Sequence, residues 1–143
     1  MIELAKRFQY KNHRCLVIDH PVDKYIKEYG FEPYYCGYVR LNEGSKFIGM
    51  DYNDIPVECH GCLTYGRYSD GTWDPDEYME EGEYWIGFDC DHASDRREHC
   101  NLEYVIGECM SIVDQLVELE RQDVHGEADD TSSMGLARFG LRF

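Results

Sequence analysis

Basic side chains are scarce in this chain. Its 143 residues include 14 lysines and arginines against 29 aspartates and glutamates, which gives a formal net charge of −15. A protein that binds nucleic acid by neutralising phosphates needs clustered lysine and arginine. The composition therefore argues against direct nucleic-acid binding. An acidic surface suits a basic partner, a metal ion or the imitation of DNA, and it also keeps a protein in solution.

Long apolar runs are missing as well. No segment approaches the roughly 20 consecutive apolar residues of a membrane-spanning helix. The N-terminal stretch MIELAKRFQY lacks the apolar core of a signal peptide. We therefore expect no membrane partner and a cytoplasmic location, in which the 7 cysteines stay reduced. Most of these thiols should be small packing residues.

Two sequence signatures of nucleotide and metal chemistry are also lacking. No glycine-rich segment stands between a strand and a helix, as a phosphate-binding loop requires. The segment from Cys59 to Cys62 supplies one C-x-x-C pair, whereas a structural zinc site usually shows two such ligand pairs. A phosphate-loop enzyme and a zinc finger are therefore both disfavoured.

The hydrophobic pattern predicts a single α+β domain. Runs of β-branched and aromatic residues predict strands at 14–19, 34–41, 57–65 and 84–92. Apolar residues at helical spacing predict one long helix over 101–122, with Asn101 as its N-cap. We expect an antiparallel sheet of about four strands with the long C-terminal helix packed on one face, and the other face open. The domain spans 1–122, and 123–143 is expected to form a flexible C-terminal tail.

The alternation within two of these strands predicts a polar site. In 84–92, Phe88 and Cys90 face the helix, whereas Trp85 and Asp89 face the open side. In 57–65, His60 lies on the polar face together with Thr64. If the two strands pair as a hairpin, His60 and Asp89 come close together on the open face of the sheet.

Three interpretations of this cluster stay open. His60, Thr64, Trp85 and Asp89 could bind a planar ligand without a metal, with Trp85 stacking on it. Alternatively, the metal ligands are His60, Asp89 and His92, with Cys62 or Cys90 as a further donor. Zinc accepts such donors and leaves a position for water, and Glu58 or Asp91 would then be the general base. In the third interpretation, these polar groups only satisfy one another's hydrogen bonds.

The segments CHGCLTY, WIGFDCDH and NLEYVIGEC resemble a group of small phage-encoded proteins without an established activity. The shared pattern is His-Gly-Gly-Leu/Ile-Thr, then Trp-x-Gly-Phe-Asp-Cys-x-His, a nearby Asp, and a helix with Tyr-Val and Glu. The matching residues are His60, Gly61, Leu63, Thr64, Trp85, Gly87, Phe88, Asp89, Cys90, His92, Asp95, Tyr104, Val105 and Glu108. Cys62 departs from the pattern because it stands where that group has glycine.

The resemblance implies a phage biology and shapes the leading hypothesis. We expect a counter-defence or host-takeover binding protein in the host cytoplasm, which sequesters a small nucleotide-like ligand or blocks a host defence protein. This function needs no cofactor. Its site would have the acidic loop 70–83 at the rim, and an open aromatic sheet face would allow a homo-oligomer.

Two alternatives remain beside this hypothesis. One is a small metal-dependent hydrolase of a nucleotide or phosphoester, and the other is an acidic DNA mimic. No catalytic residue is assigned in the binding hypothesis. The sequence therefore leaves open whether the protein is an enzyme.

Overall fold

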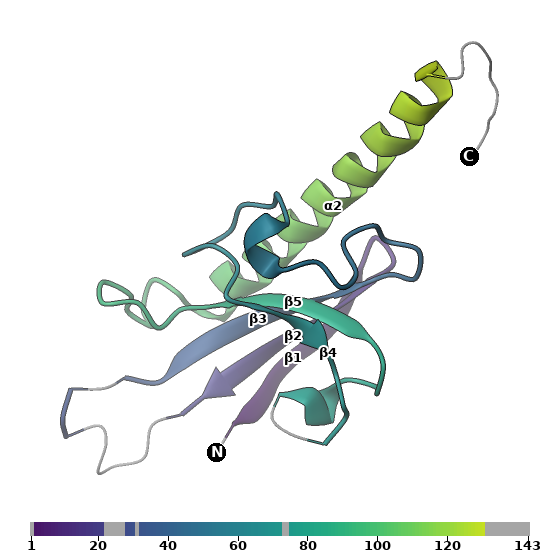
Figure 1. Ribbon diagram of the computed structural model, residues 1–143. Coiled ribbons are helices and arrows are strands. Elements are labelled where there is room, and N and C mark those ends of the chain that lie inside the picture. Colours follow the sequence, from purple (N-terminus) through teal and green to yellow (C-terminus); the bar gives the residue numbers. More distant parts are fainter. Residues whose placement is uncertain (1, 22–27, 31, 73–74, 131–143) are drawn as a thin grey trace.

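The computed structural model describes residues 2–21, 28–30, 32–72 and 75–130, and the side chains as far as residue 121 (Figure 1). Five antiparallel strands form one sheet, in the order β1-β2-β3-β5-β4. The strands are β1 (Glu3–Tyr10), β2 (His13–His20), β3 (Tyr34–Leu41), β4 (Tyr65–Tyr68) and β5 (Tyr84–Asp89). The described residues also form two short 3-10 turns, η1 (Tyr52–Asp54) and η2 (Asp76–Tyr78), and the helix α2 (Leu102–Asp130). The predicted α+β class is confirmed, with five strands where about four were expected.

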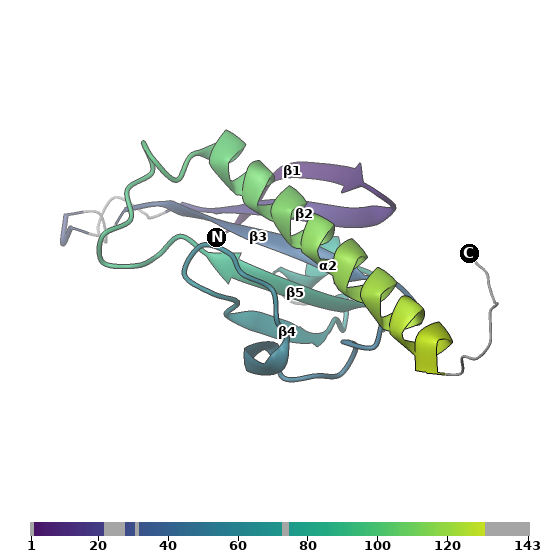
Figure 2. The same cartoon turned by 90° about the horizontal axis from the view of Figure 1, so that it is seen from above.

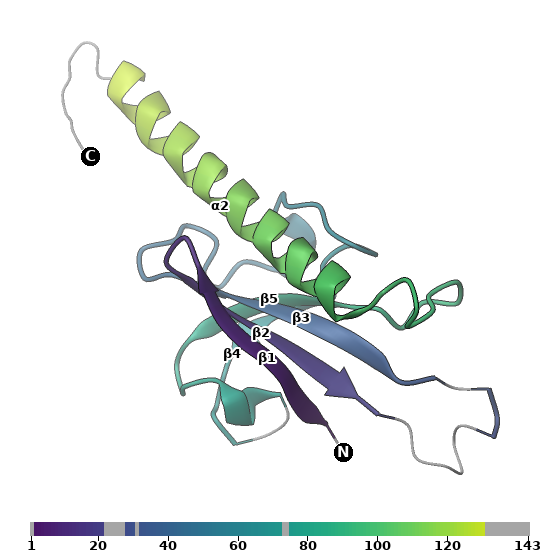
Figure 3. The same ribbon diagram turned by 180° about the vertical axis from the view of Figure 1, so that it is seen from behind.

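The strand predictions differ from the structure at two places. β1 was not predicted, and it pairs with β2 as a hairpin at one edge of the sheet (Figure 3). The prediction of a strand over 57–65 was wrong, because β4 begins only at Tyr65 and the preceding residues form a turn and extended loop. That loop lies on the side of the sheet that carries α2 (Figure 1).

The helix α2 crosses one face of the sheet diagonally (Figure 2). Asn101 is its N-cap as predicted, since its Oδ1 accepts a hydrogen bond from the backbone N–H of Tyr104 at 2.9 Å. The helix continues to Asp130, into the segment expected to be a flexible tail, and residues 131–143 lie outside the described residues. Among the described helices, none is both long enough and apolar enough to cross a bilayer.

Each face of the sheet is covered, and each has its own core. The core beneath α2 contains Ile86, Phe88 and Cys90 from β5 and the segment just after it, as the alternation predicted. The opposite core contains Trp85 together with Leu16, Ile18, Cys36, Tyr38 and Met79. Trp85 does lie on the face away from the helix, but only 1% of its surface is exposed.

The expectation of an open second face was wrong, because the segment after β4 folds back over it. Met79 packs on this face, and the carboxylate of Asp76, which is fully buried, fixes the segment. Asp76 accepts hydrogen bonds from the Tyr65 hydroxyl at 2.7 Å and from the backbone N–H of Asp70 at 3.0 Å, and it pairs with Arg67 at 3.1 Å. A buried carboxylate with three partners holds a loop in place firmly.

Candidate metal centre

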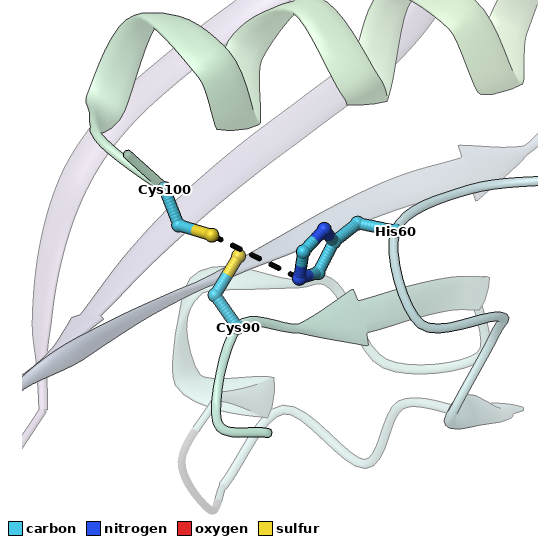
Figure 4. A group of neighbouring side chains, drawn as sticks. All are labelled: His60, Cys90 and Cys100. Carbon is cyan, nitrogen blue, oxygen red and sulfur yellow. Dashed lines mark hydrogen bonds between the residues drawn. The ribbon is translucent and has the colours of Figure 1, made fainter. Parts of the chain in front are cut away.

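Three segments that are distant in the sequence meet at the end of β5 beneath the start of α2. Figure 4 shows His60, Cys90 and Cys100 pointing toward one another from these segments. His60 lies in the turn before β4, Cys90 follows β5 directly, and Cys100 precedes the N-cap of α2. One donor atom from each of the three lies within 4.8 Å of the other two.

The position of His60 is fixed by hydrogen bonds from α2 to the loop backbone. Glu108 accepts from the backbone N–H of His60 at 2.7 Å. Glu58 stands two residues before His60 in the loop. The side chain of Gln115 accepts a hydrogen bond from the backbone N–H of Glu58 at 2.7 Å and donates one to the carbonyl of Glu58 at 2.8 Å. Side-chain bonds from the helix thus replace the strand pairing predicted here, and they place His60 on the helix side of the sheet.

Both ring nitrogens of His60 have partners. Nδ1 lies 2.9 Å from the Tyr104 hydroxyl, and Nε2 lies 2.9 Å from Oδ1 of Asp95 and 3.8 Å from Sγ of Cys100. The other oxygen of Asp95, Oδ2, lies 2.8 Å from Nδ1 of His92. One carboxylate therefore joins two histidines, and His60, His92 and Asp95 form a second candidate donor group that shares His60 with the first.

The charges of this network are set by burial and by its hydrogen bonds. Burial raises the pKa of Asp95, but the hydrogen bonds from His60 and His92 outweigh it and hold the pKa at about 2. The hydrogen bond to Asp95 raises the pKa of His92 above its usual value. Asp95 is consequently a carboxylate at neutral pH, available to a cation.

The two thiols are poor nucleophiles as they stand. Cys90 and Cys100 are 4% and 6% exposed, and burial raises the pKa of both thiols above the usual value. A cysteine nucleophile needs a lowered pKa, so this environment disfavours thiolate catalysis. A bound metal ion displaces the thiol protons, and two buried sulfurs beside an imidazole are a donor set that suits zinc.

A pocket of about 300 Å³ opens beside these donors. Its lining includes four residues of the two donor groups, namely Cys90, His92, Asp95 and Cys100. Tyr34 and Asp91 contribute further polar atoms, and Arg96 and Arg97 lie along the wall. Donor atoms at the wall of a pocket are accessible to a small molecule, which a purely structural metal site does not require.

The residues predicted as one ligand site are separated by the sheet. Thr64 and Asp89 are neighbours as expected, because Oγ1 of Thr64 donates to Oδ2 of Asp89 at 2.9 Å. His60, however, lies on the helix side, and Trp85 is buried in the opposite core. The prediction that His60 and Asp89 share an open sheet face was wrong, since it depended on the strand at 57–65. Trp85 has no exposed ring face on which a ligand could stack.

The predicted set of metal ligands also differs from the two candidate donor groups. His60 and His92 are in the candidate groups, but Asp89 is in neither, and its Oδ1 lies 3.9 Å from Nδ1 of His92. Asp95 occupies the place between the histidines that was expected for Asp89. Cys90 is a candidate donor and Cys62 is not. Asp91 lines the pocket, whereas Glu58, the other candidate base, does not.

The acidic loop expected at the rim lies elsewhere. Its described part, 70–72 and 75–83, covers the face of the sheet opposite α2, as Met79 and Asp76 show. Sequence reasoning also missed Cys100 and the roles of Asp95 and Tyr104. The short run from His92 to Cys100, rich in potential ligands, was the available signal.

Gly61 is required by the close approach of His92. Gly61 has a φ of 67°, and a Cβ there would overlap Cε1 of the His92 ring. We expect Gly61→Ala to destabilise the fold by about 1–2 kcal/mol from the left-handed backbone, and also to displace the ring of His92 from Asp95. Urea unfolding measures the first effect, and the NMR shifts of the His92 ring measure the second.

Gly44→Ala is the matched control for Gly61→Ala. Gly44 has a φ of 87°, and no heavy atom lies within 4 Å of the place that a Cβ would take, so its substitution introduces the backbone strain alone. An unchanged His92 signal in Gly61→Ala would contradict the close contact between the turn and the ring.

Comparison with known proteins gives no relative from which a function could be transferred. No protein-family model, curated protein or solved structure matches the chain. The functional argument therefore depends on the geometry of the candidate metal centre and its pocket.

Proposed function

We propose that this protein is a small zinc-dependent hydrolase that acts on a nucleotide-like molecule bound in the pocket beside Cys90 and Cys100. One observation carries the proposal: the donor atoms of His60, Cys90 and Cys100 lie within 4.8 Å of one another, and both cysteines line a pocket of about 300 Å³. Three protein donors and one free position are the typical arrangement of catalytic zinc. A structural role alone gives no reason for a pocket at the donors.

The soft donors favour the group of His60, Cys90 and Cys100 over the group of His60, His92 and Asp95. Thiolate ligands select zinc over magnesium and calcium, which prefer oxygen. In this assignment Asp95 and His92 lie next to the metal without being required to bind it. When bound, zinc would supply an activated water molecule at neutral pH.

Metal content is the first test. We expect the full chain, reconstituted with zinc after treatment with a chelator, to hold one ion per molecule by elemental analysis. Cys90→Ser and Cys100→Ser should each lose stoichiometric zinc, because each removes one of three donors. Cys62→Ser is the matched control, since Cys62 is exposed and belongs to neither donor group, and it should retain the ion.

Turnover separates an enzyme from a binding protein. Incubation of the zinc form with a panel of nucleotides should release a hydrolysis product, and the form without metal should not. Absence of zinc in the native chain, or its retention by both cysteine variants, would refute the proposal. Tight binding of a nucleotide without any product would instead favour the sequestering function expected from the resemblance.

A further inference from the structure

The charge at the candidate metal centre indicates what kind of bond is cleaved. Zinc carries two positive charges, and the thiolates of Cys90 and Cys100 would cancel both. Enzymes that transfer phosphoryl groups surround the phosphate with excess positive charge from metal ions, arginine or lysine. A neutral centre gives a phosphate dianion little stabilisation, whereas it can still present a polarised water to a carbon atom.

The two arginines of the pocket are already engaged. Arg97 forms an ion pair with Asp19 and lies 4.0 Å above the ring of Tyr35. Arg96 donates hydrogen bonds to the carbonyls of Ala93 at 3.2 Å and of Asp95 at 2.7 Å. Arg96 also lies 3.7 Å from the carboxylate of Glu32, so each guanidinium already has an acidic partner.

Three acidic residues and one histidine complete the titratable lining. Glu32, Asp91 and Asp95 line the pocket together with His92, and the chain as a whole carries a formal charge of −15. This field repels an anion and favours a neutral or amine-bearing ligand. The volume of about 300 Å³ is at the small end for ligand sites, which suits one ring system better than a dinucleotide.

From these observations we infer that the reaction, within the proposed hydrolase function, is hydrolytic deamination of a planar base that carries an exocyclic amine. Water adds to the ring carbon that bears the amine, the carbon–nitrogen bond then breaks, and the products are the ring carbonyl and ammonia. The step exchanges N for O at one carbon and needs no oxidant or reductant. The activated water would come from the zinc site.

Asp95 is the residue placed to orient the attacking water. Its Oδ1 lies 2.9 Å from Nε2 of His60, so it is adjacent to the position that a metal on this nitrogen would occupy. The carboxylate can accept a hydrogen bond from the water and hold it toward the ring carbon. His92 holds the other oxygen of Asp95 at 2.8 Å and orients it.

Ammonia and phosphate release distinguish the two bonds that could be cleaved. The zinc-loaded full chain is incubated with cytidine, adenosine and guanosine and with their 5′-monophosphates. We expect ammonia from at least one of these compounds and inorganic phosphate from none. Asp95→Asn should retain zinc and lose about 100-fold in turnover, whereas Asp54→Asn, an exposed aspartate in η1, should stay within a few-fold of the parent.

A second measurement does not depend on turnover. With cobalt in place of zinc, the sulfur-to-metal absorption bands should shift on addition of the neutral nucleoside that is the substrate and stay unchanged with inorganic phosphate. Phosphate release, or a band shift with phosphate, would overturn the inference and leave the proposed hydrolase intact. Bound zinc with neither product would overturn the inference, and failure to bind zinc would overturn the proposed function itself.

Discussion

Replacing Trp85 with alanine is expected to lower the free energy of unfolding by about 3–5 kcal/mol. Trp85 is 1% exposed, its indole N–H donates to Glu83 at 3.1 Å, and the guanidinium of Arg14 lies 5.8 Å above its ring. Truncation would leave a large cavity between the sheet and the segment around η2. Since small domains are stable by only about 5–15 kcal/mol, this one change could remove most of the stability. Urea denaturation followed by circular dichroism measures it.

Tyr68→Ala is the matched aromatic control for Trp85→Ala. Tyr68 is 53% exposed, and its ring packs edge-on against Tyr84 at 4.8 Å. Its loss should cost about 1 kcal/mol. If Trp85→Ala were no more destabilising than Tyr68→Ala, the burial of Trp85 in the second core would be contradicted. An exposed Trp85 that stacks on a ligand would then again be the better interpretation.

Zinc is expected to stabilise the fold by about 4 kcal/mol when its free concentration is a thousand times the dissociation constant. The reason is that the three donors come together only in the folded chain, so the ion binds the native state preferentially. Binding of zinc to cysteines of the unfolded chain would reduce the effect somewhat. The measurement is urea unfolding in a series of buffered zinc concentrations.

His60→Ala should abolish this dependence on zinc, because His60 belongs to both candidate donor groups. His99→Ala is its control, since the His99 side chain is 78% exposed and pairs with the neighbouring Glu98. Equal stabilisation of the parent and of His60→Ala would show that zinc binds elsewhere. The same experiment with Asp89→Asn tests the ligand expected from the sequence, and it should respond to zinc like the parent.

The first strand was missed although a local signal was present. Lys11 and Asn12 have φ values of 47° and 67° and form the tight turn between β1 and β2. Such two-residue turns favour asparagine and glycine. Half of the eight residues of β1 are polar and none is fully buried, because it is an edge strand with little to bury. Weak alternation is therefore a physical property of this strand.

The strand predicted at 57–65 was wrong although its alternation is strong. Its alternation of apolar and polar residues is real, and Val57 and Leu63 are buried in the core under α2. The turn at Gly61 and Cys62, both with positive φ, interrupts the extended backbone. Glu108 and Gln115 then supply the hydrogen bonds that a neighbouring strand would have given. A pattern of burial cannot distinguish these two sets of partners.

The sequence by itself determined the α+β class, three of the strands, the long helix with its N-cap, and which side of β5 faces that helix. These features follow from short-range periodicity and from capping, which depend on neighbours in the chain. Only the tertiary structure decided that the second face is covered, that Asp95 replaces Asp89 beside the histidines, and that His60 meets Cys90 and Cys100. These outcomes depend on which backbone and side-chain groups, distant in the sequence, satisfy one another's hydrogen bonds, and no local pattern encodes that choice.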